Sequence, residues 1–225
     1  MTVKGTKSYS WRKPAIVIGN HTSKQDFYVS AAAAARYGRI IRGLVHNTDW
    51  KDPVYRVQMT YLQMIPRMGS GDEIIKRMVR ALHENKMIGI APEGTFSRTG
   101  LVMEPFTGFL RVYFEANKDG YKVPLIPAFV KGISQAYPMK DGNFAKKNLP
   151  RKVKITAFMG KPFHLKIPEK IDKDILRKYA NHVMLKIARM GGQKRLRPNP
   201  VLEKLRKEGN EKRHYEVIDG VEDLL

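Results

Sequence analysis

The sequence predicts a single α/β domain, with a mostly parallel central sheet flanked by helices and followed by a charged C-terminal extension. Short apolar runs alternate along the chain with segments whose apolar residues recur every three or four positions, a pattern typical of βα units. The chain has 225 residues, of which 42% are hydrophobic, and this is enough for one sizeable core. We therefore divide it into a folded body, residues 1–191, and a charged extension, residues 192–225.

The first half of the body alternates strand and helix. Prolines and glycines mark several boundaries, since Pro53 opens a helix and Gly38 closes one. The predicted elements are a buried strand at 14–18, a helix at 23–37, a strand at 40–45, a helix at 53–64 and a helix that buries Ile74, Ile75, Met78, Val79 and Leu82.

The second half continues the alternation. A strand at 87–91 runs directly into the segment Pro92-Glu93-Gly94-Thr95. The remaining predicted elements are a helix at 107–117, strands at 123–130 and 153–158, and a long amphipathic helix marked by Ile171, Ile175, Tyr179, Val183 and Ile187.

The chain is strongly basic. It carries 42 Lys and Arg against 21 Asp and Glu, a formal net charge of +21. The excess lies in the body, because residues 194–225 hold eight basic and seven acidic side chains, which leaves +20 elsewhere. Such a field favours polyanions: nucleic acid, anionic lipid surfaces or phosphorylated small molecules and carriers. Charge alone does not choose among these partners.

Several classes of protein are not expected from this sequence. It has no cysteine, which excludes disulfides and thiol nucleophiles. The N-terminal residues contain no apolar segment of the kind found in a secretory signal. No stretch without Asp, Glu, Lys or Arg is longer than Val57 to Pro66, which is too short to cross a bilayer. We therefore expect a protein that does not span a membrane by itself.

A histidine and an aspartate flank the junction between the first predicted strand and its helix. On a continuous helix His21 and Asp26 would point about 140° apart, so they can meet only if His21 lies in the turn before the helix. Thr22 or Ser23 would then be the N-cap. A carboxylate on one ring nitrogen would leave the other nitrogen as a general base. The alternative is that Asp26 serves only the helix start, in a capping box with Ser23.

Two further segments carry polar groups at suggestive places. The block from Glu93 to Arg98 follows a predicted strand. In an open α/β sheet, polar residues just past the end of a strand are well placed to line a site. In a second segment, Arg67 precedes a Gly-Ser-Gly loop that opens a helix, an arrangement suited to a phosphate. A plain helix entry capped by Asp72 is the alternative for this loop.

In order and spacing these blocks resemble the lysophospholipid acyltransferase family, which includes the glycerol-phosphate and lysophosphatidate acyltransferases. That family has an Asn-His followed by four residues and an Asp, matched by Asn20, His21 and Asp26. Its other blocks are matched by Ile65-Pro66-Arg67, by Pro92 to Thr95 with Ser97 two positions on, and by Val123 to Pro127. The resemblance runs from about Pro14 to Gly132. Phe96 and Thr107 stand where the family usually has arginine and lysine, and Arg98 is the candidate replacement for the arginine.

The resemblance implies a mechanism and a set of site residues. His21 would deprotonate an acceptor hydroxyl that attacks the thioester of an acyl-CoA or acyl carrier protein, and Asp26 would orient His21. The acceptor would be a glycerol phosphate or lysophospholipid, with lysophosphatidic acid favoured, and no metal or other cofactor is implied. The implied substrate-binding residues are Asn20, Arg67, Glu93, Gly94, Thr95, Ser97 and Arg98.

The positive charge has two interpretations. A basic nucleic-acid-binding protein is the alternative function, but no zinc-finger spacing, glycine-aromatic RNA-binding signature or basic-region heptad supports it. An enzyme that takes a lipid acceptor would use the charge on an anionic membrane surface. We therefore expect a cytoplasmic, peripherally membrane-associated acyltransferase, and nucleic acid is not an expected partner.

Overall fold

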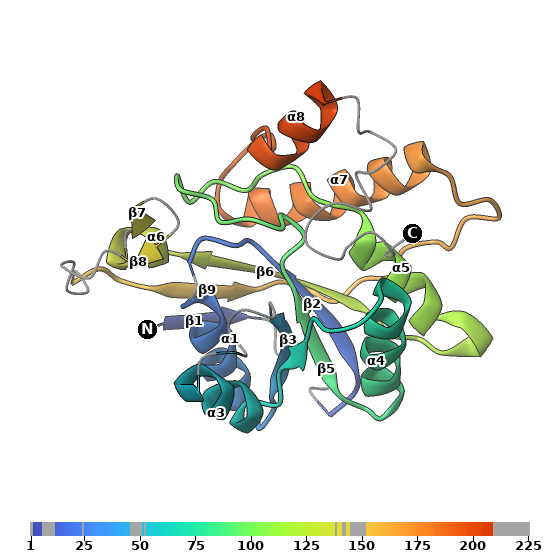
Figure 1. The fold of residues 1–225 in the computed structure, drawn as a ribbon, viewed down its shortest axis with the longest axis horizontal. Helices are drawn as coiled ribbons and strands as arrows, with labels where there is room; N and C mark the ends of the chain where they lie inside the picture. The colour runs from blue at the N-terminus through green and yellow to red at the C-terminus, as the bar shows by residue number, and fades with distance from the viewer. Residues whose placement is uncertain are drawn as a thin grey trace.

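A seven-stranded, mostly parallel sheet with helices on both faces forms the centre of the protein, as the sequence predicted (Figure 1). The computed structural model describes residues 2–5, 12–23, 25–45, 51, 53–137, 139–140, 143–144 and 152–208. The strands are β1 (Thr2–Gly5), β2 (Ala15–Gly19), β3 (Ile41–Val45), β4 (Ile65–Pro66), β5 (Met87–Ile90), β6 (Leu125–Lys131), β7 (Met139–Lys140), β8 (Asn143–Phe144) and β9 (Thr156–Met159). The helices are α1 (Asp26–Ala35), α3 (Pro53–Tyr61), α4 (Gly71–His83), α5 (Gly108–Ala116), α6 (Ile133–Ala136), α7 (Lys173–Met190) and α8 (Pro200–Lys207), with a 3-10 turn η1 at Lys118–Gly120.

The strand order places several loops at one edge of the sheet. The order is β1-β9-β6-β2-β5-β3-β4, and only the β6–β9 pair is antiparallel, while β7 and β8 pair separately. Because β6, β2, β5, β3 and β4 run in parallel, their carboxyl ends lie along the same edge. Loops that follow these ends meet there, where open α/β sheets place their ligands.

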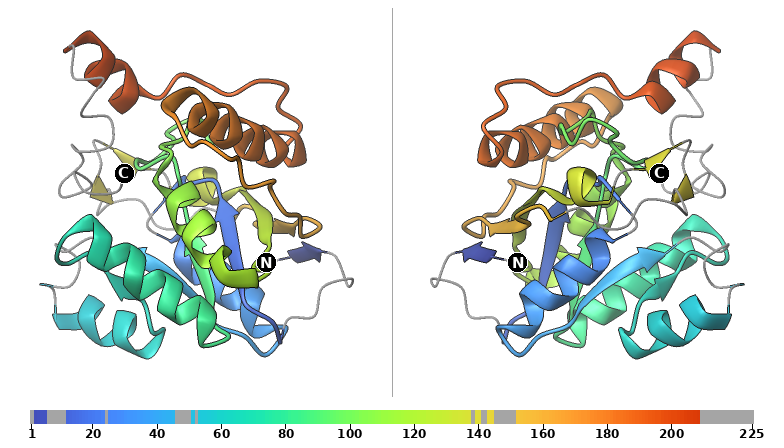
Figure 2. Two further views of the ribbon diagram at one scale, coloured as in Figure 1. Left: turned by 90° about the vertical axis from the view of Figure 1, so that its right-hand side faces the viewer. Right: turned by 90° about the vertical axis from the view of Figure 1, so that its left-hand side faces the viewer.

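Strand β2 is buried on both faces. Ile16 and Ile18 belong to the larger core cluster, which the apolar faces of α4, α5 and α7 complete. Ala15 and Val17 point the other way, into a cluster with Ala34 of α1. Successive side chains of a strand alternate between faces, so a continuous apolar run suits a strand covered on both sides. Figure 2 shows α4, α5 and α7 on one side of the sheet and α1 with α3 on the other.

The helix boundaries differ from the predicted ones where side-chain hydrogen bonds decide them. Helix α1 begins at Asp26, with Gln25 as its N-cap, and not at Ser23. Helix α4 is capped by Ser70, whose hydroxyl accepts from the Glu73 amide in a reciprocal capping box. Asp72, the predicted cap, instead forms an ion pair with Arg111.

Two elements at the ends of the described chain were not predicted. Strand β1 lies at the sheet edge beside β9, and α8 follows α7 across an extended segment. Helix α8 has a sequence signal, Asn199 as N-cap with Pro200 at the first helical position. Among the described residues, no helix combines the length and the apolar character needed to cross a bilayer.

Candidate active site

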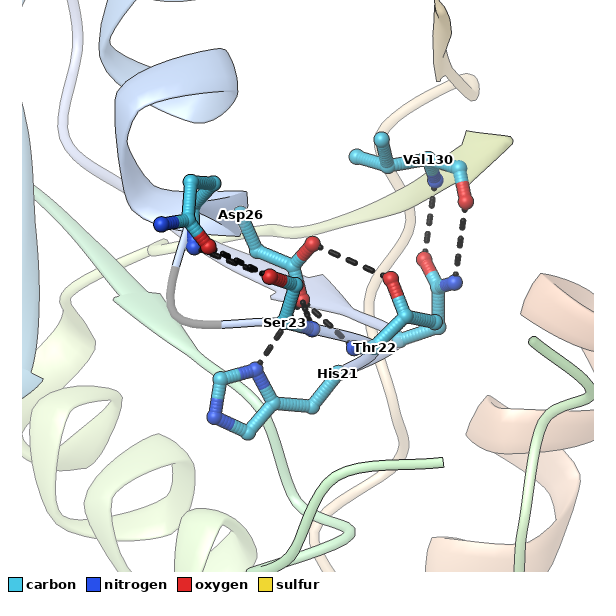
Figure 3. Close-up of polar contacts among 7 residues, drawn as sticks. His21, Thr22, Ser23, Asp26 and Val130 are labelled. Carbon is cyan, nitrogen blue, oxygen red and sulfur yellow. Dashed lines mark hydrogen bonds and ion pairs between the residues drawn. The ribbon is translucent and has the colours of Figure 1, made fainter. Parts of the chain in front are cut away.

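His21 and Asp26 lie together where β2 ends and α1 begins (Figure 3). The Nδ1 atom of His21 is 3.1 Å from Oδ2 of Asp26. The His21 side chain is 30% exposed, whereas that of Asp26 is 9% exposed. The carboxylate is thus inside the turn, and the imidazole lies between it and the surface.

The Asp26 carboxylate is held by the turn that precedes its helix. Its Oδ2 accepts from the backbone amides of Thr22, at 2.5 Å, and Ser23, at 3.0 Å. Its Oδ1 accepts from the Thr22 hydroxyl at 3.1 Å. An ionised carboxylate only accepts hydrogen bonds, so His21 donates Nδ1–H and its Nε2, directed away from Asp26, is the basic nitrogen.

This geometry combines the two interpretations that the sequence left open. Asp26 bonds the Ser23 amide, as a helix-start residue would, and the same oxygen faces His21. Thr22 and Ser23 donate to the acid and do not cap the helix, so α1 starts three residues later than predicted.

Asn20 faces the neighbouring strand. Its amide forms a reciprocal pair with the backbone of Val130 in β6: Nδ2 donates to the Val130 carbonyl at 3.0 Å, and Oδ1 accepts from the Val130 amide at 2.8 Å. The side chain is buried. It therefore fixes the end of β2 against β6, while its implied contact with substrate stays a prediction.

The loop after β5 packs directly onto His21. The Ser97 amide donates to the His21 carbonyl at 2.7 Å, and the Phe96 ring lies 4.3 Å from the imidazole, centroid to centroid. The Ser97 hydroxyl donates to the Leu101 carbonyl at 2.6 Å, inside the loop. Gly94 has φ of +63°, a left-handed conformation that glycine adopts without strain. The structure therefore brings together the first and third blocks found in the sequence.

Glu93 is buried behind this loop. Its side chain is fully covered, and its Oε1 accepts from the Met103 amide at 3.4 Å. Burial raises the pKa of Glu93 to about 9, the nearby charge of Asp26 adds to the rise, and the backbone amides of Met103 and His21 oppose it. At neutral pH this carboxyl is therefore protonated. Its implied contact with substrate stays a prediction.

Asn199 ties the C-terminal segment to the same loop. It is fully buried, its Nδ2 donates to the carbonyls of Glu93 and Glu104, both at 2.9 Å, and its Oδ1 caps α8. This residue is not among those that the sequence predicts for the site. The Asn-Pro pair signals a helix start, but nothing local indicates that its amide reaches a loop about a hundred positions earlier.

Of the remaining predicted residues, Arg67 lies farther along the same sheet edge. Arg67 follows β4, three strands from β2, or about 14 Å at the usual strand spacing. Its amide donates to the Val45 carbonyl at 2.9 Å, and its side chain is partly buried. Thr95 is partly buried, and Gly94 and Arg98 are exposed. In the described part of the chain, His, Asp and Glu side chains form no group of three that could hold a metal ion.

A histidine held by a carboxylate at the strand ends of an α/β sheet is an arrangement that general-base catalysis can use. The Acyltransferase family model matches residues 1–131, and the chain belongs to that family. No curated protein matched the sequence.

A solved structure supports the assignment of the fold. The crystal structure of the 1-acyl-sn-glycerophosphate (LPA) acyltransferase PlsC from Thermotoga maritima matches with a TM-score of 0.59 at 18% sequence identity. The match covers 84% of this chain and 71% of that chain. At this identity the likeness establishes a common fold, and it extends well beyond residues 1–131.

Replacing Glu93 by Gln should change how stability depends on pH. Between the ordinary pKa of 4.5 and the folded value of about 9, the native protein keeps a proton that the unfolded chain releases. The wild-type free energy of unfolding should therefore fall with rising pH in this window, relative to Glu93→Gln, by up to about 1.4 kcal/mol per pH unit. Denaturant unfolding from pH 5 to 8 measures the difference. Glu169→Gln, at an exposed position, is the control, and parallel curves for wild type and Glu93→Gln would contradict the assignment.

Replacing Asn199 by Ser should loosen the loop that contacts His21. Serine keeps a cap oxygen for α8 but lacks the amide that serves two carbonyls, so the free energy of unfolding should fall by about 2 kcal/mol. Hydrogen exchange of the Ser97 amide should become faster. Ser70→Ala removes the α4 cap without touching this loop, and it should leave the exchange of Ser97 unchanged. Unchanged Ser97 exchange in Asn199→Ser would refute the link.

Proposed function

We propose that this acyltransferase moves a fatty acyl group from an acyl-CoA or acyl carrier protein thioester to a glycerol-phosphate hydroxyl, with lysophosphatidic acid as the favoured acceptor. The observation that carries the proposal is the His21–Asp26 pair, with Nδ1 on the carboxylate and a partly exposed ring. The family supports acyl transfer, and the enzyme that shares the fold is itself an LPA acyltransferase.

The chemistry follows from the two ring nitrogens. Nε2 of His21 takes the proton of the acceptor hydroxyl as its oxygen attacks the thioester carbonyl carbon. Asp26 stabilises the imidazolium that forms, through the proton on Nδ1. Collapse of the tetrahedral intermediate breaks the carbon–sulfur bond, and the thiolate takes the proton back from Nε2. The products are an ester and a free thiol, and the residues of the enzyme return to their starting state.

The other predicted residues follow β4 and β5 at the strand ends, and we propose that the acceptor binds between them and His21. We propose that Arg67, three strands from His21, binds the acceptor phosphate, assisted by Arg98, while the loop of Gly94 and Thr95 contacts the glycerol. The Ser97 amide and the buried Glu93 would set the position of this loop. No step of this mechanism requires a metal.

The proposed partners follow from the acceptor. A lysophospholipid resides in a membrane, and the excess of basic residues suits an anionic bilayer surface. We propose peripheral association with such a surface from the cytoplasmic side. We also propose the division into a catalytic unit, residues 1–191, and an extension, residues 192–225, with Asn199 of the extension bonded to the Glu93 carbonyl of the catalytic unit.

Changing the histidine or its partner should remove most of the activity. His21→Ala lacks the base, and Asp26→Asn can donate to Nδ1, which moves the ring proton to Nε2. Each should lower kcat by about 10²–10⁴-fold. The measurement is thiol release from palmitoyl-CoA in the presence of lysophosphatidic acid, with thermal unfolding to establish that each variant folds.

His182→Ala, which removes an exposed histidine of α7, is the matched control and should keep wild-type turnover. A folded His21→Ala variant with wild-type turnover would end the proposal.

Removing the arginine after β4 should weaken binding of the acceptor. A charge-assisted hydrogen bond is worth about 1.5–3 kcal/mol, so Arg67→Ala should raise the KM for lysophosphatidic acid by about 10–100-fold. The KM for monoacylglycerol, which lacks the phosphate, should change little. Equal KM values for lysophosphatidic acid in wild type and Arg67→Ala would show that Arg67 does not bind the phosphate.

A further inference from the structure

Helix α3 presents an apolar stripe to solvent. Val54, Val57 and Tyr61 follow one another at helical spacings of three and four residues, so they lie on one face. They are 66%, 70% and 83% exposed, respectively. Met59 is buried, and it anchors the opposite side of the helix to the protein. The helix therefore has apolar side chains on its buried side and also on its exposed side.

This stripe is a local concentration of exposed apolar surface. Of the eight large hydrophobic side chains exposed in the described part of the chain, three lie on α3 and a fourth, Tyr28, on the adjacent α1. Single exposed hydrophobic residues are normal on a protein surface. A group of four from two touching helices indicates an interaction surface.

The stripe adjoins the candidate active site. The Tyr28 hydroxyl donates to the Gln58 side chain of α3. Tyr28 belongs to the first turn of α1, two residues after Asp26. Helix α3 thus lies beside the helix whose first residue orients His21, as the neighbouring positions of α1 and α3 show in Figures 1 and 2.

The charged residues near the stripe indicate what kind of surface it would contact. Residues 53–61 contain no Asp or Glu, and Arg56 is exposed among the apolar residues. Lys51, which the acidic Asp52 separates from the helix in the sequence, is also exposed. Apolar side chains flanked by Lys and Arg are the composition that binds the interface of an anionic bilayer.

We propose that the α3 stripe, formed by Val54, Val57 and Tyr61 with Tyr28 of α1, is the surface that inserts into the interface of an anionic membrane. Insertion there brings the start of α1, and with it His21, to the lipid surface. An acceptor could then reach the site while its acyl chain stays in the bilayer. This last step rests on the proposed function, whereas the membrane contact itself does not.

The test replaces apolar side chains without changing the net charge. The full-length double variant Val57→Ser/Tyr61→Ser is compared with Ile167→Ser/Ile171→Ser, which alters two exposed isoleucines, 44% and 51% exposed, in the segment before α7. Flotation with vesicles of phosphatidylcholine and phosphatidylglycerol measures binding. Because the replaced side chains no longer gain from leaving water, the α3 variant should bind at least about tenfold more weakly than wild type. The isoleucine variant should bind as wild type does.

Acyl transfer separates membrane contact from catalysis. With lysophosphatidic acid embedded in the same vesicles, the α3 variant should lose about as much activity as it loses binding. With a short-chain lysophosphatidate dispersed as monomers, it should match the wild type, which also shows that the variant folds.

Each other outcome has a definite meaning. Wild-type flotation of the α3 variant, or equal loss in both double variants, overturns the proposal. A wild-type dimer in solution that the α3 substitutions convert to a monomer also overturns it, because the stripe then serves a second copy of the chain. If flotation depends on α3 but the wild type acylates no acceptor, the membrane surface stands and the proposed function fails.

Discussion

The candidate site depends on the hydrogen bonds that the carboxylate of Asp26 accepts. It accepts from two backbone amides and a hydroxyl of the turn that precedes it, and it holds the imidazole of His21 as well. Hydrogen bonds to a charged group are worth about 1.5–3 kcal/mol each, so together they stabilise this conformation of the turn. The end of β2 and the start of α1 are therefore joined by the side chain of Asp26, which also contacts the histidine.

Parallel strands supply the second constraint. Because β2 and β5 are neighbours with the same direction, the loop after β5 emerges beside His21 and bonds its carbonyl through Ser97. The same alignment places Arg67 farther along the edge. The sheet thus sets the distances between groups that the sequence separates by tens of residues.

The site also draws on residues outside the matched family region. That region ends at residue 131, yet Asn199 supports the loop that packs on His21. Gln193 and Arg197 bond the backbone of Val102 in the adjoining segment, and the Arg206 guanidinium pairs with Glu104 at 3.0 Å. Residues 193–207 are therefore bonded to the body of the protein, despite their charged composition. Leu202 and Leu205 of α8 are buried, which explains why this segment packs on the body.

Local sequence determined the element types of the body and the main candidate residues. Apolar period and turn residues located β2, β3, β5, β6 and β9 and the helices α1, α3, α4, α5 and α7, because these signals act within a few residues. The His21–Asp26 pairing was also predictable, since both residues belong to one strand–helix junction. Tertiary structure alone decided the roles of Asn20 and Asn199, the burial of Glu93 and the antiparallel β6–β9 pair. It also moved the start of α1, where Asp26 took the amides of Thr22 and Ser23. These features depend on groups that meet only when the chain is folded. The residues next to a side chain in the sequence do not indicate which distant group it will contact.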